Sequence, residues 1–170
     1  MSETTVPYAN APRAGFFRRL AAIVYDALVA IAVGMCAALV MIITLLVLFE
    51  TGVLNKNGVE QVSDIIQQSL FYTTVIQLWV GFWVCGFFLW FWKHGGQTIG
   101  MRAWRLRLFS MTEQPVGYGR LLLRMVTSFL GLGTLLVLID VKHKLALQDR
   151  ASQIEVLSLS QQENDHKSWR

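Results

Sequence analysis

Two long apolar runs dominate the chain, at residues 27–49 and 70–92, and neither contains a charged residue. An α-helix rises about 1.5 Å per residue, so a helix over either run would cross a hydrocarbon core of about 30 Å. Both runs are apolar on every side, whereas a helix on the surface of a small soluble domain is apolar on one face only. The pattern predicts a membrane protein with two transmembrane helices, whose first partner is the lipid bilayer.

A third apolar segment, residues 121–139, is interrupted by Arg124, by Thr127 and Ser128, and by a Gly-Leu-Gly sequence at residues 131–133. Such interruptions suit either a re-entrant hairpin or a complete but broken span. The fold class that we predict is therefore an all-α membrane protein. It has two transmembrane helices and a third apolar helical segment that is re-entrant or spanning.

The first predicted helix begins in an amphipathic stretch at residues 14–26. Arg19 and Asp26 lie seven positions apart there, so they project from nearly the same side of the helix. A helix from residue 16 to residue 49 would be about 50 Å long, more than a bilayer core requires. We therefore expect this amphipathic N-terminal helix start to lie in the head-group region.

The remaining segments are polar. Residues 1–12 contain two prolines and predict a disordered tail, and residues 158–170 predict a polar C-terminal tail, which leaves residues 14–157 as one membrane domain. The loop around residues 55–58 contains a turn signal, Asn-Lys-Asn-Gly. Within residues 94–118, Leu106 and Leu108 alternate with arginines, which predicts a short strand.

Charge predicts the orientation. The chain has a net charge of +4, and its basic residues gather beside the apolar segments, which indicates topology signals and not a nucleic-acid partner. Those of the N-terminal region are Arg13, Arg18 and Arg19, those of the second loop are Lys93, Arg102, Arg105, Arg107 and Arg120, and the first loop has only Lys56. The positive-inside rule places the N-terminus and second loop in the cytoplasm. A complete third span would put Lys142, Lys144 and Arg150 outside, against that rule, so the rule favours the hairpin.

Ionisable residues in or beside apolar segments are the candidate functional groups, because each costs about 2.5–3.5 kcal/mol at mid-helix unless it is paired or hydrated. They are Arg19, Asp26, Arg120, Arg124, Asp140 and Asp149. We expect cross-segment pairs, either Asp26 with an arginine of the third segment or Asp149 with Arg19. Such a set suits two roles, a polar path for a proton or small ion and a structural ion-pair cluster.

Other chemistry finds little support in the sequence. His94, His143 and His166 are scattered, so we expect no metal and no cofactor. Cys36 and Cys85 lie inside the predicted spans and are expected to be inert. The glycines of residues 95–100 are not followed by the lysine of a phosphate loop, and we read them as a tight turn at the membrane surface. No catalytic constellation is visible, and we expect no enzyme activity.

Several motifs together resemble the RDD family of small bacterial membrane proteins, which is named for one arginine and two aspartates. The matching stretches are Ala-Gly-Phe-Phe-Arg-Arg-Leu-Ala-Ala at 14–22 with Asp26, the loop motif of Gly96, Gln97, Thr98 and Gly100, Leu106 to Leu108, Gly119-Arg120 with Arg124, and Leu-Gln-Asp-Arg-Ala at 147–151. The resemblance covers about residues 14–157 and assigns the naming positions to Arg19, Asp26 and Asp149. The chain departs from the family pattern at Met101, Gln148 and Ser152-Gln153, and Gln148 stands where the family usually has a histidine.

The resemblance implies a multi-pass protein of the bacterial inner membrane, with transport suggested for the family and some members similar to cation/proton antiporters. On that hypothesis Asp26 and Asp149 exchange a proton for a cation while Arg19 adjusts their proton affinity. Two spans and a hairpin cannot enclose a pore alone, so the hypothesis requires a homo-oligomer. The alternative is an interaction or assembly module, in which the charges are scaffold and the cytoplasmic loop or tail binds a protein partner.

Overall fold

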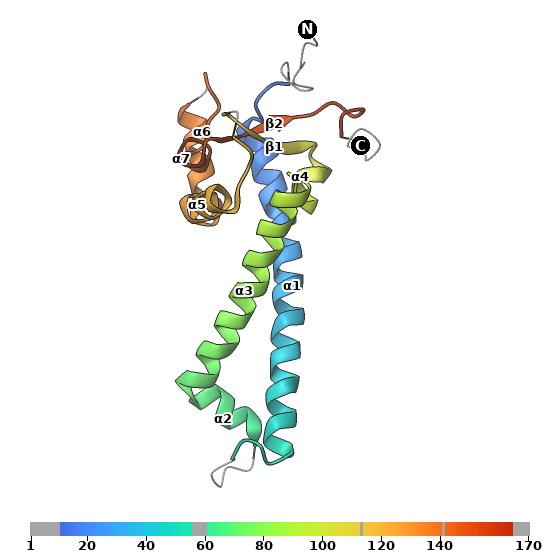
Figure 1. Ribbon diagram of the computed structural model, residues 1–170, viewed down its shortest axis with the longest axis vertical. Helices are drawn as coiled ribbons and strands as arrows, with labels where there is room; N and C mark the ends of the chain where they lie inside the picture. The colour runs from blue at the N-terminus through green and yellow to red at the C-terminus, as the bar shows by residue number, and fades with distance from the viewer. Residues whose placement is uncertain (1–10, 56–60, 113, 141, 165–170) are drawn as a thin grey trace. The chain divides into compact units, whose positions relative to one another are not determined.

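The computed structural model describes residues 11–55, 61–112, 114–140 and 142–164 (Figure 1). Its elements, in chain order, are α1 (Phe16–Glu50), α2 (Val62–Gln68), α3 (Leu70–His94), α4 (Ile99–Ala103), β1 (Leu106–Ser110), α5 (Tyr118–Ser128), η1 (Phe129–Leu135), α6 (Leu136–Ile139), α7 (Leu147–Ser152) and β2 (Ile154–Ser158). The chain forms two compact units, residues 28–87 and residues 1–27 with 88–170. Each is described by itself.

The first unit, residues 28–87, contains most of the two long apolar helices. α1 and α3 are both long and apolar enough to cross a membrane, which confirms the two predicted transmembrane helices. They pack closely where α1 has a small residue, because Gly34 leaves room for the Val80 side chain. The Trp79 indole Nε1 also donates to the Ala37 carbonyl at 3.0 Å. Between them the predicted loop contains the short helix α2, and the predicted turn at residues 55–58 lies largely outside the described residues.

The second unit contains a small antiparallel sheet. β1 pairs with β2 in a register that sets Leu106 opposite Ser158 and Leu108 opposite Val156. The N-terminal segment joins the other edge of β2, where the Ala14 amide donates to the Val156 carbonyl at 2.9 Å. The strand predicted around residue 106 is confirmed. Its partner β2 was not predicted. The mostly helical fold therefore includes a two-stranded sheet of which the sequence pattern predicted one strand.

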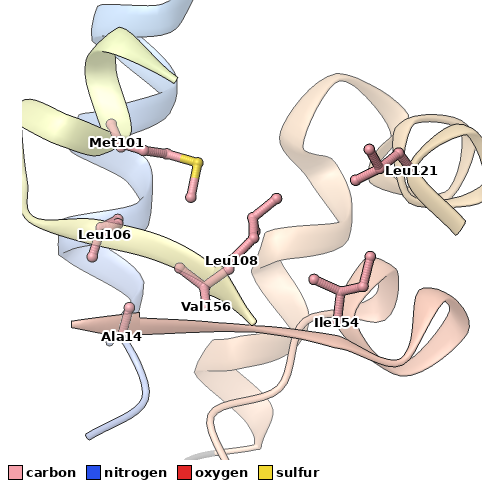
Figure 2. Packing of buried hydrophobic residues seen from close by; sticks show 8 residues of the cluster. Ala14, Met101, Leu106, Leu108, Leu121, Ile154 and Val156 are labelled. Carbon is pink, nitrogen blue, oxygen red and sulfur yellow. The ribbon is translucent and has the colours of Figure 1, made fainter. Parts of the chain in front are cut away.

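The core of this unit lies between the sheet and the helices around it (Figure 2). Alternate residues of each strand point into it, as the two-residue repeat of a strand requires. Its buried members are Ala14, Ala22, Met101, Leu106, Leu108, Leu121, Ile154 and Val156. The N-terminal segment, second loop, third apolar segment and C-terminal strand therefore share one core, although they are far apart in the sequence.

The third apolar segment is broken. Residues 118–128 and 131–139 are bent by 80° relative to one another. The Ser128 hydroxyl accepts a hydrogen bond from the Gly131 amide at 3.2 Å, and Gly131 has a φ of +99°, which favours glycine. The predicted interruption at the Gly-Leu-Gly sequence is confirmed. Such a bend suits either a re-entrant loop or a broken span.

The predicted tails lie partly outside the described residues. Of residues 1–12 only the last two are described, and the Pro12 carbonyl accepts from the Ser158 amide at 2.9 Å. Of residues 158–170 the structure describes the first seven, of which Ser158 ends β2. The domain boundaries at 14 and 157 stay predictions.

Candidate functional site

Asp149 is the centre of a buried charge network in the second unit. Its side chain is fully buried, at 0% exposure, near the start of α7. One carboxylate oxygen, Oδ2, accepts from Arg19 Nη1 at 2.5 Å, and the other, Oδ1, accepts from Arg124 Nη1 at 2.8 Å. The Ala146 amide adds a third donor at 3.0 Å. The predicted pair of Arg19 with Asp149 is confirmed, and Arg124 is an additional member.

The two arginines are held by main-chain carbonyls as well as by Asp149. Arg19 donates to the carbonyls of Ala14 and Lys144, both at 3.0 Å. Arg124 donates to the Ile154 carbonyl at 3.0 Å. Both side chains are buried, and a buried cation requires a counter-charge and filled hydrogen bonds to be tolerated. The network therefore ties α1, α5, α7 and the start of β2 to one carboxylate.

Asp26 forms a separate site. Its Oδ2 accepts from the Thr98 hydroxyl at 2.5 Å, and its Oδ1 accepts from the Gly100 amide at 2.8 Å. Thr98 also caps α4, since its hydroxyl oxygen accepts from the Met101 amide at 3.2 Å. The prediction that Asp26 pairs with an arginine of the third segment is wrong. That arginine, Arg124, is held by Asp149 instead.

Gly100 makes the Asp26 site sterically feasible. A Cβ at this position would lie 2.3 Å from the Ala22 carbonyl oxygen and 2.8 Å from Asp26 Oδ1. Only glycine lets the start of α4 come this close to α1. In the same loop Gly96 has a φ of +64°, which supports the predicted tight turn. Gln97, the remaining member of the predicted loop motif, donates to Asn164 at 3.0 Å.

Arg120 and Asp140 belong to neither site. Arg120 donates to the Ser152 carbonyl at 2.8 Å, to the Ser110 hydroxyl at 2.9 Å and to the Gln153 carbonyl, and so connects α5 with the ends of β1 and α7. Asp140 accepts from Arg150 at 2.6 Å and from His143, in a surface cluster that the sequence did not predict. Neither residue extends the Asp149 network or the Asp26 site.

The surface pair of Asp140 and Arg150 predicts that the stability of the protein depends slightly on pH in the acid range. The hydrogen bond from Arg150 lowers the pKa of Asp140 from 3.8 to about 2. A lowered pKa means that the carboxylate favours the folded state above about pH 4, and that this advantage disappears as the pH falls towards 2. Thermal unfolding of the wild type and Asp140→Asn should therefore differ slightly at pH 5–6 and converge near pH 2. A difference that persists undiminished to pH 2 would contradict this assignment.

Two glutamines of the sequence motifs, Gln97 and Gln148, are buried, and their burial was not predicted. Gln148, beside Asp149, donates to the Thr134 hydroxyl at 2.9 Å, while its Oε1 has no hydrogen-bond partner among the described residues. Gln97 Oε1 is equally without a partner in the described part of the chain. A single glutamine in a sequence carries no signal of burial. No group of three or more metal-ligating side chains occurs in the described ranges.

A comparison with protein-family models matches the RDD family over residues 13–153. The chain belongs to the RDD family. Searches of the curated proteins and of the solved structures found no match. The matched range contains the arginine and both aspartates assigned to the naming positions of an RDD protein. In this RDD protein one aspartate, Asp149, is bound to two arginines and the other, Asp26, to a hydroxyl and an amide.

Proposed function

We propose that this RDD protein is a non-enzymatic membrane interaction or assembly module, whose charge network is scaffold. The observation that carries the proposal is Asp149 bridging Arg19 and Arg124 at full burial. An acid that carries protons must be released from its partners during the cycle, which for a doubly paired buried carboxylate means leaving two cations unpaired. Asp149 is therefore well suited to hold segments together and poorly suited to exchange ions.

The composition of the two spans supports an anchoring role. Residues 28–49 and 70–87 contain no Asp, Glu, Lys, Arg or His. Intramembrane ionisable groups are the usual mark of a substrate or ion path through a membrane. The charged groups of this protein gather instead in the unit formed by residues 1–27 and 88–170. We assign the spans to anchoring and that unit to recognition.

The partner that we propose is a protein bound through the second loop or the C-terminal segment, on the cytoplasmic face of a bacterial inner membrane. Exposed basic residues on this unit offer charge for such contacts; they include Arg18, Arg102, Arg105, Lys142, Lys144 and Arg150. Solubilisation in a mild detergent should co-purify a stoichiometric partner. Recovery of this chain alone, or with copies of itself only, would count against the proposal.

One observation favours a second function, cation/proton exchange by a homo-oligomer. Asp26 is buried in α1, and its described partners are the neutral Thr98 hydroxyl and the Gly100 amide. A buried carboxylate without a cationic partner is a functional candidate, because it binds a proton or a cation without first breaking an ion pair. Asp149 has no such freedom, so this version of exchange rests on Asp26 alone.

The variant Asp26→Asn separates the two functions. The amide that replaces Oδ2 cannot accept from Thr98, and a hydrogen bond to a charged group contributes about 1.5–3 kcal/mol. The assembly proposal therefore expects less Asp26→Asn than wild-type protein in the membrane. It also expects that the wild type itself carries no cation flux. Flux is measured in proteoliposomes per molecule of folded protein, with Asp64→Asn, an exposed acid of α2, as the matched control. If the wild type carried cations and an equal amount of folded Asp26→Asn did not, the assembly proposal would be overturned and exchange established.

A further inference from the structure

The hydrogen bonding of β2 places both ends of the third apolar segment on one face of the membrane. α1 and α3 are the two spans, so the N-terminal segment before α1 and the loop after α3 lie on the same face. β2 pairs with β1 in that loop and, at its other edge, with residues 12–14. β2 must therefore lie on this face as well. The chain between β1 and β2 leaves the face and returns to it, which a single complete crossing cannot do.

The surface of α5 indicates the surroundings of the chain between β1 and β2. Leu121 and Arg124 are buried towards the core, while Leu122, Leu123 and Val126 are between 45% and 67% exposed. Beyond the bend the exposure of apolar side chains continues, at Leu132, Leu135, Leu138 and Ile139. An apolar surface of this extent is rare on a protein surface that faces water. It requires a partner that is itself apolar.

The end of α3 gives the depth of α5. Trp90 and Lys93 lie at the end of the second span, the position at which tryptophans and lysines mark the membrane interface. Lys93 Nζ donates to the Val116 carbonyl at 2.8 Å and lies 5.6 Å from the centre of the Tyr118 ring. α5 therefore begins at the level where α3 leaves the hydrocarbon. The exposed apolar face of α5 therefore starts beside the interfacial end of a membrane-spanning helix.

We infer that residues 118–139 are an interfacial re-entrant insertion, with the exposed face of α5, η1 and α6 embedded in the acyl chains of the one leaflet nearest the β1–β2 sheet. Lipid is the occupant that the observations favour, because α5 begins beside the interfacial end of α3 and both flanks of the segment return to the same side. The charge network fits this placement. Arg120 and Arg124 are the two charged residues of the insertion. Arg124 donates to Asp149 and Arg120 to the carbonyls of Ser152 and Gln153, so both have polar partners within this unit.

Single-cysteine labelling tests the inference in the full chain, after Cys36→Ser and Cys85→Ser remove the native thiols. In sealed vesicles of one orientation, a membrane-impermeant maleimide should label Lys142→Cys from the same side as Ser160→Cys. Val53→Cys, in the first loop, should label from the opposite side. Labelling of Lys142→Cys together with Val53→Cys would establish a complete span and overturn the inference.

Lipid contact is tested at Val126→Cys, with Leu123→Cys as a second variant. Both should react with the impermeant maleimide at least tenfold more slowly than Ser160→Cys. Bimane attached at either position should lose fluorescence in vesicles of brominated phosphatidylcholine, whereas bimane at Ser160→Cys should not. Fast labelling at both positions would show a face in water, and slow labelling without quenching would show a face covered by protein. Either result would overturn the inference, and a face in water would not bear on the assembly or exchange proposals.

Discussion

Asp149→Asn should remove most of the protein from the membrane fraction. The substitution leaves Arg19 and Arg124 buried, at 4% and 5% exposure, without their counter-charge. Removing one partner from a buried ion pair costs about 3–5 kcal/mol, which is a large share of the stability of an ordinary domain. The measurements are the amount of protein in isolated membranes and the denaturant midpoint of the purified variant.

Asp140→Asn is the matched control for this experiment, because it removes an aspartate that also pairs with an arginine. The Arg150 side chain of that pair is 53% exposed, and surface ion pairs contribute little. We expect wild-type amounts of Asp140→Asn at neutral pH. If Asp149→Asn accumulated and unfolded like Asp140→Asn, the network would not be the structural centre of this unit.

Gly100→Ala should also destabilise the protein strongly, through a different mechanism. The new methyl group would meet the Ala22 carbonyl oxygen at 2.3 Å, and the main chain of α1 cannot move aside as a flexible side chain could. α4 would be displaced, and both hydrogen bonds to Asp26 would be lost with it. Overpacking costs about 1–3 kcal/mol, and the hydrogen bonds to the carboxylate add to that. Thermal unfolding in detergent measures the loss.

Gly119→Ala controls for the change from glycine to alanine itself. Gly119 lies in α5 with nothing within 4 Å of the Cβ position. Alanine is favoured over glycine inside a helix by about 0.5–1 kcal/mol, so this variant should unfold at an equal or slightly higher temperature. Equal behaviour of the two variants would mean that α4 does not approach α1 as closely as the structure shows.

The sequence predicted what depends on composition and local pattern. The two spans follow from the length of their apolar runs, and the break in the third segment follows from its glycines. The pair of Arg19 with Asp149 was also predicted, since a buried arginine requires an acid and few acids lie near apolar segments. Each of these inferences needed only residue types and their positions.

The sequence could not predict what depends on main-chain groups or on distant pairing. The donor that holds Asp26 is partly the amide of Gly100, and every residue except proline has such an amide. β2 forms because β1, 44 or more positions earlier, offers it a partner in register. The bridging of two arginines by one aspartate depends on the fold that brings α1 and α5 to α7. Because Arg124 is bound to Asp149 in this fold, it is not the partner of Asp26.

The central claim is that the N-terminal segment, the second loop and the C-terminal strand form one unit on one face of the membrane. Met111 donates to the Gln153 carbonyl, and counting from that hydrogen-bonded pair makes Leu108 and Val156 a non-hydrogen-bonded pair. Cα atoms of such pairs lie about 4.5 Å apart, which a disulfide can bridge. The most direct measurement is oxidation of Leu108→Cys/Val156→Cys in isolated membranes, without the native cysteines. We expect a disulfide within one chain, and none in Phe109→Cys/Val156→Cys, whose side chains lie on opposite faces of the sheet. No disulfide in the first variant, or one only between chains, would contradict the account.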